Sequence, residues 1–146
     1  MPNENQVHFE QSAVIPFRLN GKTPEILVIT SQSGKRWIVP KGFVEPDLSP
    51  VESARKEAYE EAGVKGTVYS KELGRYDYEK WGGICDVVVF PMKVEQELQN
   101  WPERMWRERK WVTIKKALDI LDDRVPREII RALQNLLNKQ LDKSVK

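Results

Sequence analysis

Residues 42–64 read Gly-Phe-Val-Glu-Pro-Asp-Leu-Ser-Pro-Val-Glu-Ser-Ala-Arg-Lys-Glu-Ala-Tyr-Glu-Glu-Ala-Gly-Val, and this stretch predicts the best-defined helix of the chain. Ser49 can cap a helix that begins at Pro50, and Glu52 can complete a capping box with Ser49. Gly63 is suited to the left-handed conformation that commonly ends a helix, so we expect the helix to span about 50–62. Four apolar residues fall on one stripe that should face a core: Val51, Ala54, Ala58 and Ala62.

Three carboxylates recur on this helix within one turn of each other. Glu57, Glu60 and Glu61 stand at i, i+3 and i+4, so they share a face roughly 110° from the apolar stripe. Their mutual repulsion would be reversed by a divalent cation, and carboxylates without histidine or thiol suit Mg²⁺ or Mn²⁺. The alternative is a solvent-exposed helix whose charged side chains form ion pairs with one another, because Glu52, Lys56 and Glu60 are spaced four residues apart.

Outside the helix, the pattern predicts short strands on both sides of it. Apolar runs bounded by turn residues favour strands at 7–19 (interrupted at Pro16), 26–29, 36–39, 67–78, 84–94 and 111–112, with a hairpin around Gly82-Gly83. The C-terminal part has helical periodicity at about 114–121 and 125–141. Strands around one helix, followed by closing helices, predict an α/β sandwich built on a mixed sheet.

Composition narrows the possible chemistry. The chain has 146 residues, 40% of them hydrophobic and 32% charged, which suits one soluble domain. Its apolar runs are too short to span a bilayer and no leader segment is evident, so we expect a cytoplasmic protein without a membrane partner. One cysteine (Cys85) and one histidine (His8) cannot form a disulfide or a Cys/His zinc site, and they disfavour a histidine-dependent nucleophile. Carboxylates, lysines, arginines or a hard metal must therefore carry any reaction.

The charge is unevenly distributed along the chain. Residues 1–103 carry 12 Lys and Arg against 16 Asp and Glu, whereas residues 104–146 carry 12 against 6. A basic C-terminal third could face phosphate groups, although two amphipathic helices with solvated faces would account for most of these charges. No basic run alternates with aromatic residues, so nucleic acid is a disfavoured partner.

The stretch 42–64 resembles the Nudix box, whose pattern is Gly, five residues, Glu, seven residues, then Arg-Glu-apolar-x-Glu-Glu-x-Gly-apolar. The matching residues are Gly42, Glu57, Ala58, Glu60, Glu61, Gly63 and Val64. Two positions depart from the pattern, since Leu48 replaces a glutamate and Lys56 replaces the arginine. Lysine keeps the charge but lacks the bidentate fork of arginine, so we expect metal binding to survive and positioning to loosen.

The resemblance extends over about residues 10–122. Further segments are similar to the Nudix branch that hydrolyses diadenosine and diphosphoinositol polyphosphates: 36–40, Glu45-Pro46, 60–66, 101–103 and 107–111. The resemblance implies a single Nudix domain over 1–146, folded as an α/β/α sandwich with a mixed sheet, with the box at 42–64 and C-terminal helices at about 114–141. It also implies a Nudix hydrolase that cleaves phosphoanhydride bonds in nucleoside diphosphate-linked or dinucleoside polyphosphate substrates by attack of water.

The resemblance assigns roles to residues of the box and its surroundings. Glu57, Glu60 and Glu61 would hold Mg²⁺ or Mn²⁺ together with the backbone carbonyl of Lys41 or Gly42. Glu61, or alternatively Glu57, would take the proton of the attacking water, and Lys56 would hold the catalytic helix in place. Five cations are expected to bind the polyphosphate: Lys35, Arg36, Lys41, Arg107 and Arg109.

Several questions stay open from the sequence. Glu95, Glu97 and Glu103 are alternative sources of a base or an extra metal ligand. The protein could be a monomer or a homodimer. Two other functions compete with the first, namely removal of pyrophosphate from RNA 5′ ends and a catalytically weak Nudix-fold binding or regulatory module.

Overall fold

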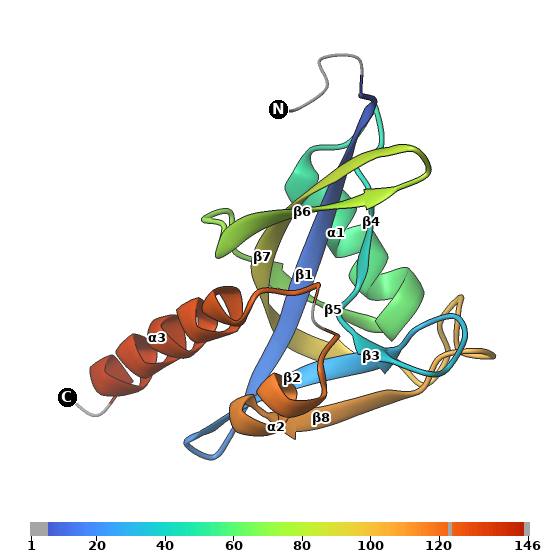
Figure 1. Cartoon of the computed structure of the whole chain (residues 1–146). Coiled ribbons are helices and arrows are strands. Elements are labelled where there is room, and N and C mark those ends of the chain that lie inside the picture. The colour runs from blue at the N-terminus through green and yellow to red at the C-terminus, as the bar shows by residue number, and fades with distance from the viewer. Residues whose placement is uncertain (1–5, 123, 145–146) are drawn as a thin grey trace.

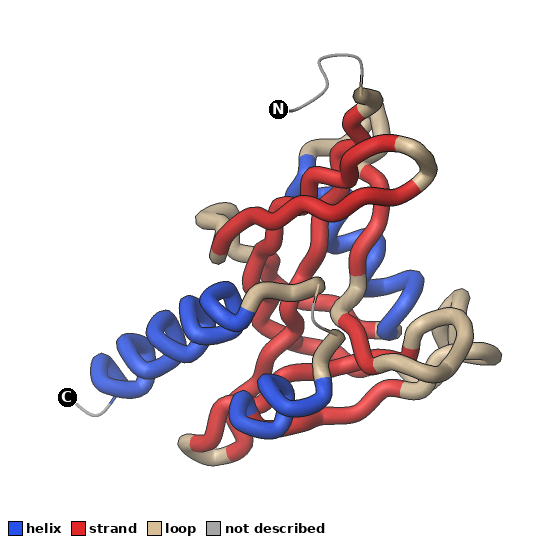
Figure 2. Tube along the Cα trace, in the orientation of Figure 1, coloured by secondary structure: helices blue, strands red, loops and turns tan. Residues whose placement is uncertain are grey.

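A mixed eight-stranded β-sheet forms the centre of the computed structural model, which describes residues 6–122 and 124–144 (Figures 1 and 2). The strands are β1 (His8–Asn20), β2 (Thr23–Thr30), β3 (Trp37–Ile38), β4 (Lys41–Phe43), β5 (Val64–Val68), β6 (Gly74–Lys80), β7 (Gly83–Glu97) and β8 (Arg109–Thr113). The helices are α1 (Pro50–Glu57), which continues as the π-helical turn η1 (Ala58–Ala62), α2 (Ile114–Ile120) and α3 (Arg127–Ser144).

The sheet is mixed because its two longest strands, β1 and β7, pair in parallel while every other pair is antiparallel. The strand order is β3-β2-β1-β7-β5, with β4 on β1, β6 on β7 and β8 on β2. This confirms the mixed sheet predicted from the sequence.

Helices cover both faces of the sheet (Figure 1). The alanine stripe of α1 and η1 packs on one face, against Val14, Leu27, Ile29, Val88 and Phe90. Residues of α2 and α3 pack on the opposite face, against Ala13, Ile15, Phe17, Val28 and Val89. Alternate residues of each strand therefore serve two cores, as in an α/β/α sandwich. Among the described residues, no helix is both long and apolar enough to cross a membrane.

The helix of residues 50–62 forms as the sequence predicts at both ends. The Ser49 side chain accepts the N–H of Glu52, whose carboxylate accepts the N–H of Ser49, and Gly63 ends the helix at φ 66°. The difference lies inside the helix, whose last five residues form a π-helical turn. Such turns are rare and often occur at functional sites, and this one carries Glu60 and Glu61.

The strands differ from the sequence-based expectation in several ways: β4 was not predicted, and the ends of β1, β2, β3, β7 and β8 shift by one to three residues. Three further differences concern β5 and β6, Pro16 and the hairpin turn. The strand expected at 67–78 is two strands, β5 and β6, because Pro91 of the shared partner β7 has no N–H with which to continue the ladder. Pro16 does not interrupt β1, since it falls where the antiparallel neighbour of β1 changes from β4 to β2. The turn of the β6–β7 hairpin is formed by Trp81 and Gly82, and Gly83 already belongs to β7.

Candidate active site

Glu61 is the most buried of the three glutamates on the helix formed by α1 and η1. It is 9% exposed, and its carboxylate meets two donors from outside the helix. Oε1 accepts the backbone N–H of Lys41 at 3.0 Å, and Oε2 lies 3.3 Å from Nη2 of Arg107. The residue is therefore fixed between β4 and the loop that precedes β8.

Glu57 lies one turn earlier, directly against Gly42. A Cβ atom on residue 42 would overlap the carboxyl group of Glu57, so a larger residue there would displace this carboxylate from its place beside the β4 backbone. The glycine of the box and its glutamate are thus in contact, and both lie next to the Lys41 N–H that binds Glu61.

Burial and like charges raise the pKa values of two of these carboxyl groups. The pKa of Glu57 rises to about 8, first because the group is removed from water and then because Glu61, Glu60 and Glu103 lie nearby. Burial likewise raises the pKa of Glu61 to about 7, although the Lys41 N–H and Arg107 oppose this rise. Carboxylates that repel one another in this way are suited to receive a cation.

The carboxylates do not all point at one place. Within residues 6–122 and 124–144, no group of three or more His, Cys, Asp or Glu side chains is arranged to hold a metal ion. Glu61 points to Lys41 and Arg107, and Glu60 lies 3.7 Å from the ammonium of Lys56. The donor set nonetheless fits a hard divalent cation in its chemistry, because it consists of carboxylates on adjacent helical turns beside a main-chain segment.

Lys56 links the helix of residues 50–62 to the segment that precedes it. Its ammonium group donates to Oε1 of Glu45, and the backbone N–H of Glu45 donates to Oγ of Ser53 on the same helix. Glu45 thus supplies a carboxylate partner for this cation although Leu48 stands at the box's usual glutamate position.

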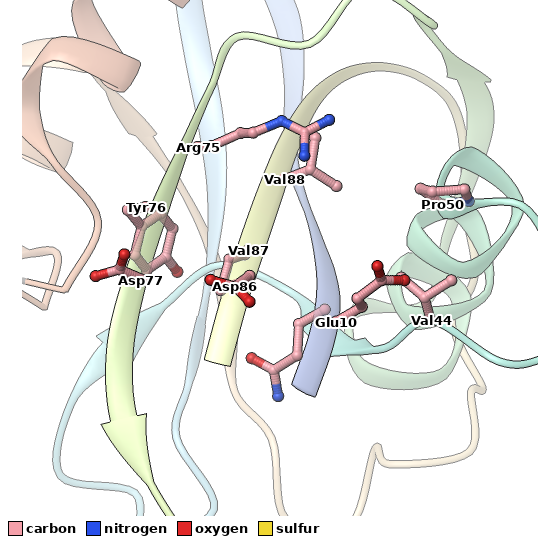
Figure 3. A pocket seen from close by; sticks show the side chains of 10 residues that line it. Glu10, Val44, Pro50, Arg75, Tyr76, Asp77, Asp86, Val87 and Val88 are labelled. Atoms are coloured by element: carbon pink, nitrogen blue, oxygen red, sulfur yellow. The ribbon is translucent and has the colours of Figure 1, made fainter. Parts of the chain in front are cut away.

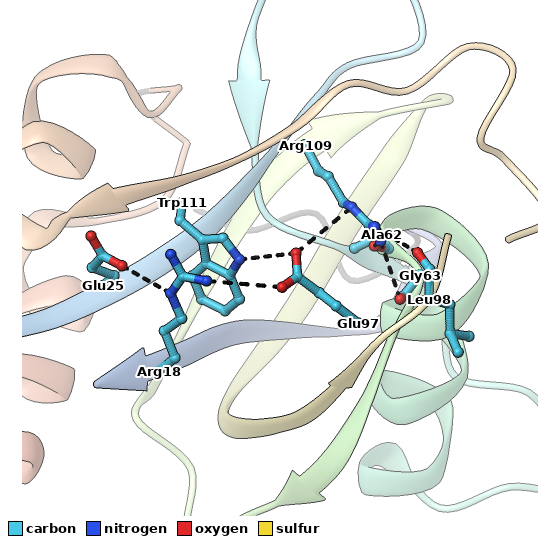
Figure 4. A network of polar contacts seen from close by, with 8 residues as sticks. All are labelled: Arg18, Glu25, Ala62, Gly63, Glu97, Leu98, Arg109 and Trp111. Carbon is cyan, nitrogen blue, oxygen red and sulfur yellow. Dashed lines mark hydrogen bonds and ion pairs between the residues drawn. The ribbon is translucent and has the colours of Figure 1, made fainter. Parts of the chain in front are cut away.

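The loop at 98–108 and the start of β8 cap the C-terminal end of this helix, where main-chain carbonyl groups need donors. Glu103 N–H donates to Glu60 O (3.0 Å), Trp101 Nε1 to Glu61 O (3.1 Å), and Arg109 Nη1 to Ala62 O (2.9 Å) and Gly63 O (3.2 Å). Figure 4 shows the Arg109 guanidinium directed at the carbonyls of Ala62 and Gly63. Its position differs from the expected substrate-binding role, because its donors are engaged by the backbone and it does not line the cleft described below.

Of the three acids that the sequence left open in this region, the structure brings Glu103 to the site. Arg107 bridges Oε1 of Glu103, at 2.9 Å, and Glu61. Glu95 instead accepts from the Thr67 hydroxyl, and Glu97 accepts from Trp111 (Figure 4).

A cleft of about 390 Å³ opens beside Glu61, which is the one of the three helix glutamates that lines it. Five cationic residues line it: Arg36, Lys41, Lys80, Arg107 and Arg124. Arg36, Lys41 and Arg107 were predicted from the sequence, whereas Lys35 is exposed and lies outside the lining. Lys80 and Arg124 were missed, because they reach the cleft from the β6–β7 hairpin and from the α2–α3 connection.

The cations of this cleft lie close enough to affect one another. The pKa of Lys41 falls to about 8, mainly because of burial and then because Arg124 and Lys80 are near. Lys41 Nζ donates to the hydroxyl of Tyr78 at 2.9 Å, and this hydroxyl donates to Gln11 Oε1 at 2.8 Å. Concentrated positive charge of this kind favours an anion such as a phosphate chain.

A second cavity, of about 520 Å³, lies on the α1 side of the sheet (Figure 3). Glu10, Asp86 and Asp77 stand side by side there on β1, β7 and β6. None of the residues predicted from the sequence to act in catalysis, metal binding or substrate binding lines this cavity, so we place the candidate active site in the cleft beside Glu61.

Arg107 is expected to stabilise the fold as well as the site. Its side chain is 4% exposed and donates to Thr30 O, Glu61 and Glu103. Arg107→Met should lower the free energy of unfolding by about 3 kcal/mol, because removal of one partner leaves the other carboxylate buried without compensation. Urea unfolding would measure the change, with the exposed Arg104→Met as control; equal and small effects of both substitutions would contradict this role.

A comparison with known protein families identifies the domain. The sequence model of the NUDIX domain matches residues 9–133, which include nearly the whole sheet, α1, η1, α2 and the start of α3. The chain belongs to the NUDIX domain family.

Relatives of this NUDIX chain include several plant proteins. Nudix hydrolase 18, mitochondrial, of Arabidopsis thaliana is 37% identical over 85% of this chain and 75% of its own length. Nudix hydrolase 12, mitochondrial, of the same plant is 40% identical over 66% of this chain and 51% of its own length. Diphosphoinositol polyphosphate phosphohydrolase 3-alpha of Mus musculus is 33% identical over 80% of this chain and 71% of its own length. The chain therefore spans about half to three quarters of the length of these relatives.

Solved structures show that the NUDIX fold is shared. A binary complex of the C. elegans Ap4A hydrolase superposes with a TM-score of 0.76 at 22% identity, covering 90% of this chain and 98% of that one. The E. coli ORF135 protein superposes with a TM-score of 0.71 at 24% identity, covering 93% and 95% of the two chains. At these identities the likeness concerns the fold.

Proposed function

We propose that this NUDIX protein hydrolyses a phosphoanhydride bond in a nucleoside diphosphate-linked or dinucleoside polyphosphate substrate, with Mg²⁺ or Mn²⁺ as cofactor. The observation that carries this proposal is the direct contact between two oppositely charged halves of one site. Glu61 lines the same cleft as Lys41, Arg36 and Arg107, so carboxylates suited to a metal adjoin cations suited to phosphate.

Each half of the site has a separate task. Glu57, Glu60 and Glu61 would hold the metal, together with a main-chain carbonyl of Lys41 or Gly42. When bound, the metal neutralises phosphate oxygens and acidifies water. Glu61, or Glu57, would accept the proton of the attacking water, a task suited to carboxyl groups whose pKa values are raised toward neutrality.

The cations of the cleft would orient the phosphate chain. Arg36, whose Nη1 lies 2.7 Å from Asp122, and Lys41 flank the entrance to the box and would hold phosphates next to the metal. Arg107 would act indirectly, because it is buried against Glu61 and Glu103 and so keeps Glu61 in place. The names of the mouse diphosphoinositol polyphosphate phosphohydrolase and the C. elegans Ap4A hydrolase support a polyphosphorylated substrate.

A substrate panel tests the proposal. Phosphate-containing products should appear from a dinucleoside polyphosphate only when Mg²⁺ or Mn²⁺ is present, and EDTA should stop the reaction. ADP-ribose, nucleoside triphosphates, diphosphoinositol polyphosphates and triphosphorylated RNA complete the panel. Preference for the RNA would favour an RNA 5′ pyrophosphohydrolase. If folded protein releases no product from any of these substrates, a binding or regulatory module would be favoured.

A further inference from the structure

Three aromatic rings form an exposed cluster at one end of the sheet. Phe9, Phe43 and Trp81 contact one another with ring centroids 5.4–6.1 Å apart. Phe43 is 47% exposed and Trp81 is 57% exposed, and their two rings are tilted by 32°, so the cluster offers an exposed aromatic surface to the solvent. We refer to these three residues as the aromatic platform.

Trp81 occupies a position where a large side chain is unusual. It is the first turn residue of the β6–β7 hairpin and has φ 54°, the one positive value among the described non-glycine residues. Two-residue hairpin turns with positive φ at both positions favour Asn, Asp or Gly. A strained backbone that carries an exposed indole favours a functional role for the ring, since local folding alone would select a smaller residue.

The platform lies on the same face of the sheet as the cationic part of the active-site cleft. On β4, Phe43 follows Lys41 by two residues, so their side chains point the same way. On the neighbouring strands, Phe9 and Tyr78 both stand opposite Cys85, and Tyr78 bonds the ammonium of Lys41. The aromatic platform and Lys41 are therefore neighbours on this face of the sheet.

Lys80 connects the two regions. It lines the cleft, and its ammonium lies 4.4 Å from the centroid of the Trp81 ring. A phosphate in the cleft and a ring stacked on Trp81 would both be within reach of this flexible side chain. Aromatic faces next to cations are the combination that binds nucleobases attached to phosphates.

We propose that the aromatic platform binds the nucleobase of a substrate whose phosphates lie along Lys41 and Lys80. This inference rests on the proposed hydrolysis of polyphosphates and narrows it to substrates that carry a base. An inositol ring is saturated and hydroxylated, so it gains nothing from stacking on such a surface. The platform thus selects nucleoside polyphosphates over diphosphoinositol polyphosphates.

Trp81→Asn is the decisive variant, because asparagine accepts positive φ and keeps the hairpin turn. We expect the Kd for diadenosine tetraphosphate to rise about tenfold, and the Kd for inorganic tripolyphosphate to stay unchanged. Both are measured in EDTA, where the substrate survives, by calorimetry on the full chain. Trp106→Asn is the matched control, since Trp106 is 51% exposed and lies outside the described cavities. Phe43→Leu provides a second test that leaves the turn untouched.

Several results would contradict the proposal that the aromatic platform binds a nucleobase. These are equal binding of the two probes by the unaltered protein, undetectable binding of diadenosine tetraphosphate, and a loss in Trp81→Asn that is the same for both probes. Failure of the proposed hydrolysis would look different, because base-dependent binding would persist while no metal-dependent product formed.

Discussion

Replacing Glu61 by glutamine should lower kcat for metal-dependent hydrolysis by about a thousandfold, within the range observed for loss of a catalytic acid or base. The amide keeps the shape of the side chain and can still accept the Lys41 N–H through its oxygen. What it loses is the negative charge that binds a cation and the capacity to take a proton at neutral pH. Initial rates on a dinucleoside polyphosphate with saturating Mg²⁺ measure the effect.

The control for this substitution should change a charge without touching the site. Glu128→Gln lies on the exposed surface of α3 and should leave kcat unchanged. Circular dichroism of Glu61→Gln should remain close to that of the unaltered protein, and urea unfolding should remain a single cooperative transition. The amide loses the hydrogen bond from Nη2 of Arg107, because its NH2 group then faces this donor, but Arg107 keeps Thr30 O and Glu103 as partners. A Glu61→Gln protein with more than a tenth of the original kcat would refute a catalytic or metal-binding role for this residue.

Local signals in the sequence were enough to predict the helix of residues 50–62. Ser49, Glu52 and Gly63 form its caps as expected, because capping depends on residues three or four positions apart. The π-helical turn at 58–62 was not predictable in the same way. It forms where Glu103, Trp101 and Arg109 donate to the carbonyls of the last turn, and these donors are about 40 residues away in sequence.

The sequence predicts those site residues that lie close together along the chain, but not those that the fold brings together from distant segments. The helix spacing brings Glu57, Glu60 and Glu61 together, and the resemblance to the Nudix box names them. The cleft depends on sheet register instead: Lys41 meets Tyr78 because β4 and β7 both pair with β1 while β6 pairs with β7. Sequence alone does not reveal such a pairing, so Lys80 and Arg124 were missed, and the contacts of Arg109 with the main-chain carbonyls of Ala62, Gly63 and Leu98 were not foreseen.

Metal-free protein should lose stability as the pH rises from about 5 to about 8, and Glu57 should cause much of this loss. The pKa of Glu57 is about 8 in the folded protein, against 4.5 for the ordinary group. Between these values the folded state binds more protons than the unfolded state, so the free energy of unfolding decreases with pH. Glu61, with a pKa of about 7, acts in the same direction. Because Glu57 is only half-buried, we expect its contribution to be about 2 kcal/mol rather than the full value of the shift.

Glu57→Gln tests this assignment, since an uncharged amide removes the titration. In EDTA at pH 8 the variant should be more stable than the unaltered protein by about 2 kcal/mol, and its stability should vary less between pH 5 and pH 8. Millimolar Mg²⁺ should stabilise the unaltered protein at pH 8, because the cation binds the ionised carboxylates, and should have little effect on the variant. Glu72→Gln, which removes an exposed carboxylate paired with Arg75, should follow the unaltered protein throughout. Destabilisation of the metal-free protein at pH 8 by Glu57→Gln would contradict this assignment. It would mean that attractive contacts stabilise the ionised carboxylate of Glu57, so that its pKa is not raised by burial and repulsion.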